Sequence, residues 1–441
     1  MGLAEAVREA GVLGAGGAGF PAHVKYQRDA EILIVNGAEC EPLAHKDEAI
    51  LAERAADVVA AVAALREELG AREVIIAVKG SRSGPLQELY GGVKIHPLAE
   101  FYPAGDEAVL VYEVTGRRMP AAGIPPDVGV VVSNAETIWN VARAGRGKKV
   151  TTTWVTVGGA VAEPFTAEVP LGTTAAFLIA EAGGPTVPAY VVFDGGPMMG
   201  EEINDPAAFG VQQTTGLILV LPWDSPAAVK ARLPLEHVRT VAGSACTQCR
   251  DCTELCPRYL LGYDVQPHLS MRRFFSWGEE ADPAFFAPAS GCTGCGLCEL
   301  YACPMEIAPR RVQNYLRGRL EGTMPAEGLG EAHPERGGRR VPGGRLRRRL
   351  DVASWDGGAP PRDLREAPRR LVLNLVQAYA RPLEGAVREG DVVEPGQAVA
   401  EPAAGDERGV PVHASLGGRV VAANDRTVEI DRTQVAGYAG A

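Results

Sequence analysis

The first 150 residues alternate between short apolar runs and one long stretch of helical spacing. Apolar runs at 32–35 and 74–78 are bounded by polar residues and predict two buried β-strands. Between them, residues 49–69 carry apolar side chains every three or four positions, which predicts an amphipathic crossover helix: Leu51, Ala55, Val58, Val62, Leu65 and Leu69. Another apolar run at 130–132 leads into a second helix. The order of strand, helix and strand indicates the α/β class.

The pattern changes three times further along the chain. Residues 151–240 contain strand-like runs at 152–159 and 216–221 around a helical segment at 174–180, which predicts a small β-rich module. Residues 327–370 are rich in Gly, Pro and Arg and have no hydrophobic period, so we expect a mobile tether. Because its basic charge contrasts with the acidic remainder, folding back onto the body or docking to an acidic surface is the alternative. Short strands separated by Gly-containing turns in residues 371–441 predict a small β-barrel sandwich.

Eight of the nine cysteines lie between positions 246 and 303. They read C-T-Q-C-R-D-C-T-E-L-C-P from position 246 and C-T-G-C-G-L-C-E-L-Y-A-C-P from position 292. Short loops with this spacing deliver three thiolates to one face of a cubane iron–sulfur cluster. A zinc knuckle needs only two paired cysteines per half, and a disulfide framework does not crowd four cysteines so closely in a long chain. The sequence therefore predicts two [4Fe–4S] clusters.

The fourth cysteine of each group stands too far along its loop to bind the cluster that its neighbours hold. In two-cluster ferredoxins this cysteine crosses to the other cluster. We therefore expect one ligand set of Cys246, Cys249, Cys252 and Cys303, and a second of Cys292, Cys295, Cys298 and Cys256. Four residues separate Cys298 from Cys303, against three in the first group, so the local loop geometry should differ.

Composition narrows the class of protein. The 441 residues suffice for three or four domains, and the net charge of −11 argues against a nucleic-acid partner. No apolar run approaches the roughly 18 residues of a membrane span, and the first residues lack the form of a secretory signal. We expect a cytoplasmic protein without a transmembrane segment, because a reducing compartment suits oxygen-sensitive clusters.

A glycine-rich segment at 14–21, G-A-G-G-A-G-F-P, formally contains the dinucleotide fingerprint G-x-G-x-x-G. The fingerprint requires a strand before it and a helix after it, whereas residues 3–10 are typical of a helix and Pro21 interrupts the segment after the glycines. Such a loop instead lets backbone N–H groups approach a phosphate or a flat ring closely. A flexible surface turn is the alternative.

Four motifs in this order carry a resemblance to a known family: G-A-G-G-A-G-F-P, N-G-A-E-C-E-P at 36–42, G-D-E at 105–107 and S-N-A-E-T at 133–137. Together they resemble the FMN- and NADH-binding domain of the complex I 51-kDa subunit family. The chain is more similar to Rnf complex C subunits and to the cobalamin reductases of propanediol-utilisation microcompartments, over nearly its whole length.

This resemblance implies five parts. They are an α/β domain that binds FMN and NADH (1–150), a β-grasp module of the SLBB type (151–240), an α-helical ferredoxin-type domain with two [4Fe–4S] clusters (241–326), the linker (327–370) and a C-terminal barrel-sandwich hybrid (371–441). No lysine occurs in residues 371–441, which excludes covalent attachment of lipoate or biotin there.

The resemblance also implies site residues. Those around FMN would be Gly14, Gly16, Lys25, Asn36, Glu39, Gly105, Asp106, Glu107, Ser133, Asn134 and Thr137. Phe20, Glu41 and Tyr102 would face the nicotinamide nucleotide, and Glu41 and Glu107 are the candidate catalytic carboxylates. Lys25 places a positive charge for a phosphate. Phe20 suits stacking on an aromatic ring, although a core position is an equal alternative. Ala38 stands where complex I members carry an acid.

Three further features have plain interpretations. Cys40, outside the cluster groups, is expected to be a small buried hydrophobe without chemistry. His268 is expected to be a surface histidine and no metal ligand. The loop G-G-P-M-M-G at 195–200 matches a loop of the SLBB module, as a spacer between flavin and clusters or as a corrinoid-binding segment.

The combination of parts suggests an electron path. Nicotinamide delivers a hydride, whereas iron–sulfur clusters accept single electrons, so a flavin must convert between them. By resemblance, NADH would reduce FMN, FMN would feed the two clusters, and the clusters would reduce cobalamin, as in a corrinoid reductase of a bacterial microcompartment. The expected partners are NAD(H), a corrinoid or another one-electron acceptor, and an adenosyltransferase or microcompartment shell protein.

Two alternatives remain open. One is an Rnf-type subunit that passes electrons between ferredoxin and NAD, although Rnf C subunits carry the barrel before the flavin domain and this chain carries it at the end. The other is a non-catalytic electron-transfer or scaffold protein that binds clusters but no flavin, for which Ala38 is the one hint.

Overall fold

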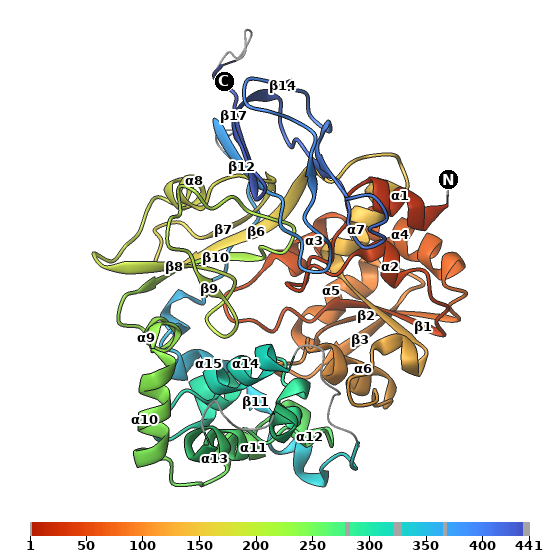
Figure 1. Ribbon diagram of the computed structural model, residues 1–441. Helices are drawn as coiled ribbons and strands as arrows, with labels where there is room; N and C mark the ends of the chain where they lie inside the picture. Colours follow the sequence, from red (N-terminus) through yellow and green to blue (C-terminus); the bar gives the residue numbers. More distant parts are fainter. Residues whose placement is uncertain (1, 278–282, 321–328, 365–367, 435–441) are drawn as a thin grey trace.

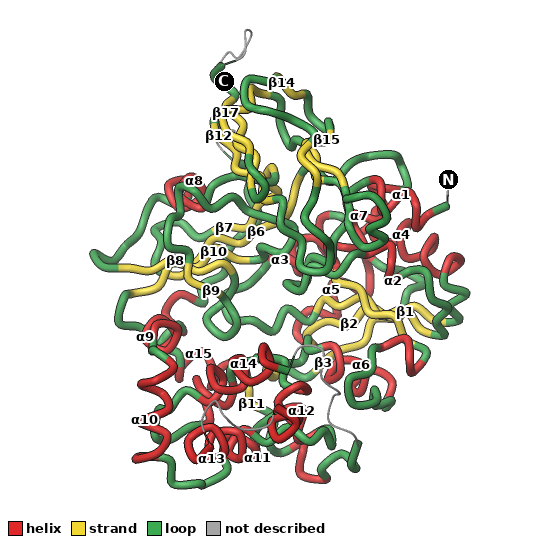
Figure 2. Tube along the Cα trace, in the orientation of Figure 1, coloured by secondary structure: helices red, strands yellow, loops and turns green. Residues whose placement is uncertain are grey.

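The computed structural model describes residues 2–277, 283–320, 329–364 and 368–434. Figure 1 shows a sheet with helices around it in the first third of the chain, a second sheet beside it, a helical part below both and a small β-domain above. Figure 2 shows the same division by secondary structure, with helices dominating the lower part. Within the described residues, no helix combines the length and the apolar character that a membrane span requires.

The first domain is built on a four-stranded parallel sheet in the order β3-β2-β1-β5. Its strands are β1 (Ile32–Gly37), β2 (Glu73–Lys79), β3 (Lys94–Leu98) and β5 (Val130–Asn134). Leu33, Ile34 and Val35 of β1 are fully buried, as expected for a strand covered on both faces. The chain runs outward from β1 to β3 and then returns to the other side of β1. The carboxyl ends of β1 and β5 therefore form the switch point where such sheets bind ligands.

Seven helices accompany this sheet: α1 (Leu3–Glu9), α2 (Ala22–Lys25), α3 (Lys46–Glu53), α4 (Ala55–Glu68), α5 (Gly80–Leu89), α6 (Glu107–Thr115) and α7 (Ala135–Ala144). The single helix expected over 49–69 is divided at Arg54, whose backbone is not helical. Arg54 pairs with Glu168 at 3.1 Å and lies over the Trp154 ring. These contacts to the second domain outweigh the helical spacing of the sequence, which local pattern does not reveal.

The second domain is a five-stranded mixed sheet in the order β7-β6-β10-β8-β9. Its elements are β6 (Thr152–Gly159), β7 (Phe165–Pro170), α8 (Ala175–Glu181), β8 (Tyr190–Asp194), β9 (Glu201–Glu202) and β10 (Leu217–Pro222). The predicted strands and the helix between them are confirmed. Phe165, Leu178 and Ile218 fill its core.

The third domain is helical and carries the cysteine loops. Its elements are α9 (Pro226–Arg232), α10 (Leu235–Ala245), α11 (Asp251–Glu254), α12 (Pro257–Leu260), α13 (Pro267–Trp277), η3 (Pro283–Gly291), η4 (Cys298–Ala302) and α14 (Pro309–Arg319). Val238, Met271, Phe274 and Val312 form the core around which α10, α13 and α14 pack.

The prediction of a mobile tether between the third and last domains is wrong for residues 329–355. We call these residues the strap. The strap contains η5 (Pro334–Gly337), β11 (Val341–Pro342), α15 (Gly343–Arg349) and η6 (Ala353–Trp355). β11 pairs with β4 (Phe101–Tyr102), and Leu346 and Leu350 are fully buried. Arginine and glycine are the commonest residues of the strap. Its few apolar residues include Leu346 and Leu350, whose spacing of four places them on the same face of a helix, where both are buried.

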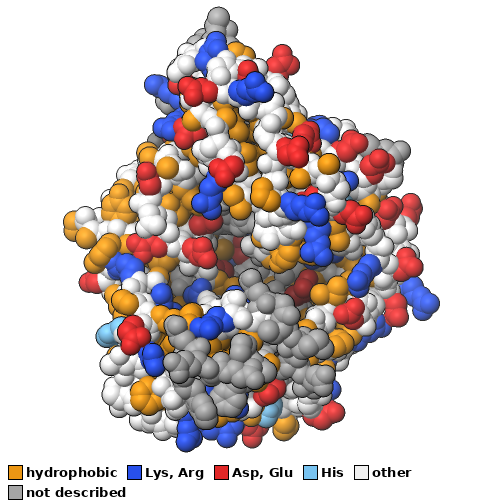
Figure 3. All heavy atoms as spheres, in the orientation of Figure 1, with side chains coloured by type: hydrophobic (Ala, Val, Ile, Leu, Met, Phe, Trp, Pro, Cys, Tyr) orange, Lys and Arg blue, Asp and Glu red, His pale blue; other side chains and the backbone are white. Residues whose placement is uncertain are grey.

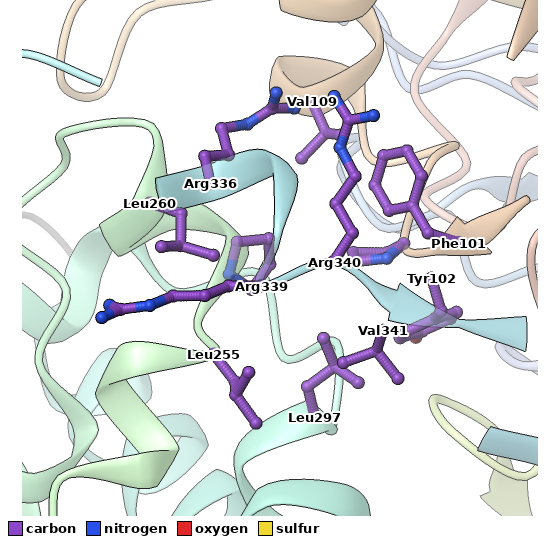
Figure 4. A pocket seen from close by; sticks show the side chains of 12 residues that line it. Phe101, Tyr102, Val109, Leu255, Leu260, Leu297, Arg336, Arg339, Arg340 and Val341 are labelled. Atoms are coloured by element: carbon purple, nitrogen blue, oxygen red, sulfur yellow. The ribbon is translucent and has the colours of Figure 1, made fainter. Parts of the chain in front are cut away.

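The strap lies across the boundary between the first and third domains. Figure 4 shows Arg336, Arg339, Arg340 and Val341 of the strap around a pocket, facing Phe101 and Tyr102 of the first domain and Leu255, Leu260 and Leu297 of the third. Arg340 makes two hydrogen bonds of 2.7 Å to the Glu113 carboxylate, and Arg336 also pairs with Glu113. Arg336 and Arg340 therefore pair with a carboxylate of the protein itself.

The last domain has two small antiparallel sheets, β12-β18-β17-β14 and β13-β15-β16. The strands are β12 (Arg370–Asn374), β13 (Glu384–Gly385), β14 (Val392–Val393), β15 (Ala398–Glu401), β16 (Val412–His413), β17 (Gly418–Ala423) and β18 (Thr427–Asp431). Gly-containing turns at 388–391 and 394–397 connect its strands, as the sequence predicted for this domain. Leu371, Val399 and Ile430 join one hydrophobic core with Val7 and Trp139. The barrel, at the top of Figure 3, is therefore fixed to the first domain.

Candidate functional site

The glycine loop lies over the carboxyl end of β5. The Gly14 N–H donates to the Phe20 carbonyl at 2.9 Å, which closes the loop, and the Ala15 N–H donates to the Thr137 hydroxyl at 2.9 Å. A side chain added at Gly16 would reach the Asn134 side chain at 3.5 Å. Gly17 adopts φ +99°, and nothing lies within 4 Å of the position its Cβ would take. The loop therefore combines a fixed base with an open tip.

Lys25 brings a positive charge to the same place. Its Nζ donates to the Val132 carbonyl of β5 at 2.8 Å and lies 3.4 Å from the Glu107 carboxylate. The neighbouring Tyr26 hydroxyl hydrogen-bonds Ser133 at 2.7 Å, and burial raises the pKa of Tyr26 well above its usual value. These contacts of Lys25 and Tyr26 attach α2 to the end of β5 and to the start of α6.

Asn36, at the carboxyl end of β1, connects this strand to the segment before α6. Its amide donates to the Gly105 carbonyl at 3.0 Å and accepts from the Ala38 N–H at 3.1 Å. A side chain at Gly105 would lie 3.3 Å from both Ala38 Cβ and Cys40 Sγ, which is tighter than ordinary contact. Asp106 caps α6 by accepting from the Ala108 and Val109 N–H groups.

These residues fit a flavin mononucleotide. Gly16 and Gly17 leave backbone exposed at the loop tip, so a phosphate or ring can come close without meeting a side chain. The Lys25 ammonium lies at the switch point and keeps 27 % of its side chain accessible. The predicted FMN residues thus come from four separate segments that meet at one edge of the sheet.

A buried charge network beside this edge was missed by the sequence analysis. Lys46 Nζ lies 2.7 Å from Asp47 Oδ1 and 3.0 Å from Glu136 Oε2, and all three side chains are enclosed. Asp47 accepts from the Asn134 amide at 2.7 Å, and Glu136 accepts from Thr153 and Trp154 of the second domain. The network fixes the orientation of Asn134, whose oxygen caps α7. Glu136 belongs to the S-N-A-E-T motif, but no periodic or motif signal distinguishes Lys46 and Asp47 in the sequence.

Glu39, predicted to contact FMN, is held by protein groups. Its carboxylate accepts from the Asp47 and Glu48 N–H groups at 2.9 and 3.2 Å, at the start of α3. Burial, and then the nearby Asp47 charge, raises the pKa of Glu39 to about 7. Contact between Glu39 and the flavin stays a prediction.

Glu41 and Tyr102 lie at the junction of the first three domains. Glu41 Oε1 accepts from the Met198 N–H at 2.6 Å, and Tyr102 donates to the Cys295 carbonyl at 2.7 Å. Burial raises the pKa of Glu41 to about 7, whereas hydrogen bonds from the Met198 and Met199 N–H groups act in the opposite direction. The structure brings this pair to the cysteine loops, and the expected contact with the nicotinamide stays a prediction.

Phe20 is the one predicted nicotinamide-facing residue at the glycine loop. Its ring packs edge-to-face on Tyr379 of the barrel domain, with ring centroids 5.2 Å apart. Tyr379 is 41 % exposed. The aromatic pair therefore borders the loop from two domains, and Tyr379 escaped the sequence analysis because 358 intervening residues separate it from Phe20.

The loop at 195–200 contacts both the first and the third domain. Gly196 has no room for a side chain, since its Cβ would lie 2.6 Å from Glu41 Cδ. The Met198 carbonyl accepts from Arg310 at 2.5 Å, and the Met198 side chain is fully buried with Leu297 and Leu300. These contacts support the spacer interpretation of the two that the sequence left open.

The first cysteine set lines one cavity. Cys246, Cys249, Cys252 and Cys303 all border it, and so do His268 and Met271. Burial, followed by the proximity of Cys303 and Cys249, raises the pKa of Cys252 to about 12. A set of thiols that repel one another as thiolates fits a cationic iron centre, which would offset that repulsion. This grouping, with Cys303 crossing over, is the one expected from the sequence.

The second set is enclosed more deeply. Cys256 and Cys298 are buried, and burial raises the pKa of Cys256 to about 12, with Cys292 as the nearest thiol that adds to the effect. Burial followed by Cys256 and Cys292 raises the pKa of Cys295 well above its usual value. Among the described residues no group of three or more His, Cys, Asp or Glu side chains is spaced to hold a single metal ion.

His268 differs from the expected surface position. The side chain is buried, and its Nδ1 hydrogen-bonds the Thr253 hydroxyl at 2.7 Å. The residue is satisfied within the protein, as the sequence analysis expected, but it forms part of the wall behind the first cysteine set. Its packing against α11 was not visible in the sequence because the contact depends on the fold of the cysteine loop.

Family models match four successive stretches of the chain. They are a Nuo51 FMN-binding domain at 7–143, an SLBB domain at 154–202, a 4Fe-4S dicluster domain at 245–308 and an RnfC barrel sandwich hybrid domain at 362–436. These matches confirm the predicted fold class and the order of its parts.

Two curated relatives match along almost the whole chain. The cobalamin reductases PduS of Salmonella typhimurium and Citrobacter freundii are each 38 % identical, over 98 % of this chain and 96 % of the relative. The C subunit of the ion-translocating oxidoreductase complex of Rhodobacter capsulatus is 31 % identical over 60 % of this chain and 51 % of its own length. A NAD+-reducing [NiFe]-hydrogenase in the H2-reduced state is 22 % identical over 74 % of this chain and 63 % of that chain, with a TM-score of 0.49.

Proposed function

The chain belongs to the PduS family of cobalamin reductases, and from that membership we propose that it carries electrons from NADH through FMN and two [4Fe–4S] clusters to a corrinoid. It is an oxidoreductase with an FMN-binding domain and a 4Fe-4S dicluster domain. The proposal adds the electron donor, the acceptor and the path between them.

The residues at the switch point would hold FMN. Lys25 would neutralise phosphate charge, and the Gly16 and Gly17 backbone would lie against the flavin. Asn36 and Gly105 would line the side that faces the cysteine domain. Bound FMN would supply the conversion of a hydride, which carries an electron pair, into two single-electron transfers.

Other residues position and protect this site. Glu107 begins α6 beside Lys25 and, with its side chain 40 % exposed, can accept or release a proton at the edge of the site. Phe20 and Tyr379 offer aromatic surface for a nicotinamide nucleotide that enters over the glycine loop. Cys256, Cys292, Cys295 and Cys298 would hold one cluster, and Cys246, Cys249, Cys252 and Cys303 the other.

One observation carries the proposal. β4 and the segment that follows it, which would supply Gly105 and Asp106 to the flavin site, also contact the second cysteine set through Tyr102 and Cys295. The proposed electron-donor and electron-acceptor sites would therefore share one continuous contact rather than form two independent modules.

The test is an anaerobic assay of the whole reconstituted chain. NADH is expected to bleach the flavin absorbance and to support reduction of aquocobalamin at a higher rate than reduction of ferredoxin. Absence of flavin bleaching would contradict the proposal. Faster reduction of ferredoxin would instead favour the Rnf-type role, and protein that binds iron but no FMN would favour the scaffold role.

A further inference from the structure

The two cysteine sets occupy different positions relative to the flavin site, and the difference is large enough to order them. We propose that Cys256, Cys292, Cys295 and Cys298 hold the entry cluster, which receives electrons from the flavin, and that Cys246, Cys249, Cys252 and Cys303 hold the exit cluster, where the acceptor is reduced. This order rests on the proposed function, since it presumes that electrons start at the flavin.

The entry set is packed against the first domain. Cys256 and Cys292 join a hydrophobic cluster with Phe101, Ala104 and Ala108, which flank the Gly105–Asp106 segment. Cys295 packs with Tyr102 in a neighbouring cluster. The entry set therefore shares its apolar surroundings with the residues that border the predicted flavin.

Two polar contacts fix this junction. The Tyr102 hydroxyl donates to the Cys295 carbonyl at 2.7 Å. Arg258, two residues beyond Cys256, pairs with Asp106 at 3.1 Å, with only 14 % and 8 % of the two side chains exposed. Both contacts join the flavin-side segment to a cysteine loop of the entry set.

The exit set has a different environment. Cys246 and Cys303 pack only with residues of the third domain in their hydrophobic cluster, among them Val238, Phe274 and Val312. Cys249 is exposed, whereas Cys256 and Cys298 are buried. Arg250 and Met305 beside this set are also exposed. An acceptor that comes from solution reaches the exit set at Cys249, while the entry set has no comparably exposed cysteine.

Two short segments connect the sets. The chain passes from Cys252 of the exit set to Cys256 of the entry set through α11, and from Cys298 of the entry set to Cys303 of the exit set through η4. α11 and η4 pack against each other. The crossing of the fourth cysteine in each loop thus places the two clusters as neighbours, in series between the flavin side and the surface.

A conservative substitution labels the exit cluster without removing a ligand. Gln248 donates to Cys246 Sγ at 3.1 Å, and hydrogen bonds to cluster sulfur set the reduction potential. Gln248→Met keeps the length of the side chain and removes the donor. In a potentiometric titration of the reconstituted chain followed by EPR, one of the two cluster signals is expected to shift to lower potential, and this signal is that of the exit cluster.

Tyr102→Phe is the matched variant for the entry cluster. It keeps the buried ring and removes the hydroxyl that donates to the Cys295 carbonyl, so the other signal is expected to change while the exit signal keeps its wild-type potential. A result in which both variants alter the same signal would overturn the assignment.

Rapid freezing after mixing with NADH then reads the order in the wild-type protein. The signal altered by Tyr102→Phe should appear first, and the signal altered by Gln248→Met second; the reverse order would overturn the proposal. Failure of NADH to bleach the flavin would count against the proposed function alone. Light-driven reduction of the bound FMN would then replace NADH, and the order of the two signals would be read in the same way.

Cys249→Ser provides an independent readout at the exposed exit ligand. FMN content and NADH-dependent reduction of the remaining cluster are expected to persist, while the rate of aquocobalamin reduction falls at least about tenfold, or about 1.4 kcal/mol in activation free energy. If the remaining cluster in this variant is reduced by dithionite but not by NADH, Cys249 belongs to the entry cluster and the proposal is wrong.

Discussion

Arg258 joins the flavin side to the cysteine domain through a buried ion pair. Its guanidinium pairs with Asp106, and this charge holds the pKa of Arg258 above its usual value although burial acts in the opposite direction. Removal of one partner of a buried pair leaves an uncompensated charge, which is the costly case.

Arg258→Ala is therefore expected to lower the free energy of unfolding by about 3–5 kcal/mol. The midpoint of urea denaturation, followed by the visible absorbance of the clusters, measures the effect. Lys94→Ala removes a pair with Glu73 whose side chains are 57 % and 41 % exposed, and it should cost at most about 1 kcal/mol. Equal effects of the two variants would show that the Arg258 pair does not join the domains.

Gly196 is a second residue whose identity follows from a tertiary contact. Because a Cβ at this position would collide with the Glu41 side chain, Gly196→Ala is expected to displace the 195–200 loop and to cost about 1–3 kcal/mol. Gly91→Ala is the control, since nothing lies within 4 Å of its Cβ position. Thermal unfolding of the two variants compares them, and a Gly196→Ala protein as stable as the control would contradict the spacer role.

Some residues of the site could be predicted from the sequence and others could not. The cysteine sets were predictable because their spacing is local and the crossing of the fourth cysteine is a property of short loops. The contacts of Glu41 and Tyr102 could not be predicted from the sequence, since their partners Met198 and Cys295 lie 157 and 193 positions away. Lys46, Asp47 and Glu136 were missed because burial of charge depends on the assembled domains.

Among the elements, the strap departs most from expectation. Its sequence is dominated by Arg and Gly, yet β11 extends β4 and α15 buries Leu346 and Leu350. The spacing of four between these leucines was an available signal for a helix turn, but the surrounding arginines obscured it. The parallel sheet and the second domain, by contrast, were predictable because continuous apolar runs define their strands.

Leu346→Ala is expected to destabilise the protein by about 2–5 kcal/mol, because the side chain is fully buried between domains. Release of the strap should also make residues 329–355 accessible to limited proteolysis. Arg348→Ala, at an exposed position of the same helix, should leave both the proteolysis pattern and the urea midpoint near wild type. Equal cleavage of the wild type and the Leu346→Ala variant would support the tether interpretation instead.

At the scale of the whole molecule, the barrel is attached to the flavin domain beside its glycine loop. Gly11 has φ +80°, and its Cβ would lie 2.6 Å from the Pro411 carbonyl and 3.3 Å from His413 Nδ1. His413 is 4 % exposed, and its Nδ1 has no hydrogen-bond partner among the described residues. Burial, and then the positive charge of Lys149, lowers the pKa of His413 to about 4.

This interface predicts a pH dependence of stability. Because the folded protein holds His413 neutral, its contribution to stability is fully present above pH 6.5 and is lost as the pH falls toward 4. The melting temperature of the wild type relative to that of His413→Gln should therefore fall between about pH 7 and 5. His237→Gln, on the exposed face of α10, controls for the loss of an imidazole. A difference that stays constant with pH would contradict a neutral, buried His413.

The order of the domains along the chain differs from their arrangement in space. The barrel follows the cysteine domain along the chain but returns to pack beside the glycine loop, where Tyr379 meets Phe20. The sequence predicted the barrel and its position along the chain. It did not predict the return, because packing between domains leaves no periodic pattern in either one.

The central claim is that one flavin and two clusters operate in series, and one experiment tests it most directly. Anaerobically reconstituted protein, with its iron and FMN measured beforehand, is mixed with NADH and followed by visible absorbance and EPR. The account predicts about eight irons and one FMN per chain, bleaching of the flavin, and the appearance of two cluster signals. Far less iron, absence of FMN, or flavin that bleaches while both clusters stay oxidised despite being reducible by dithionite would contradict it.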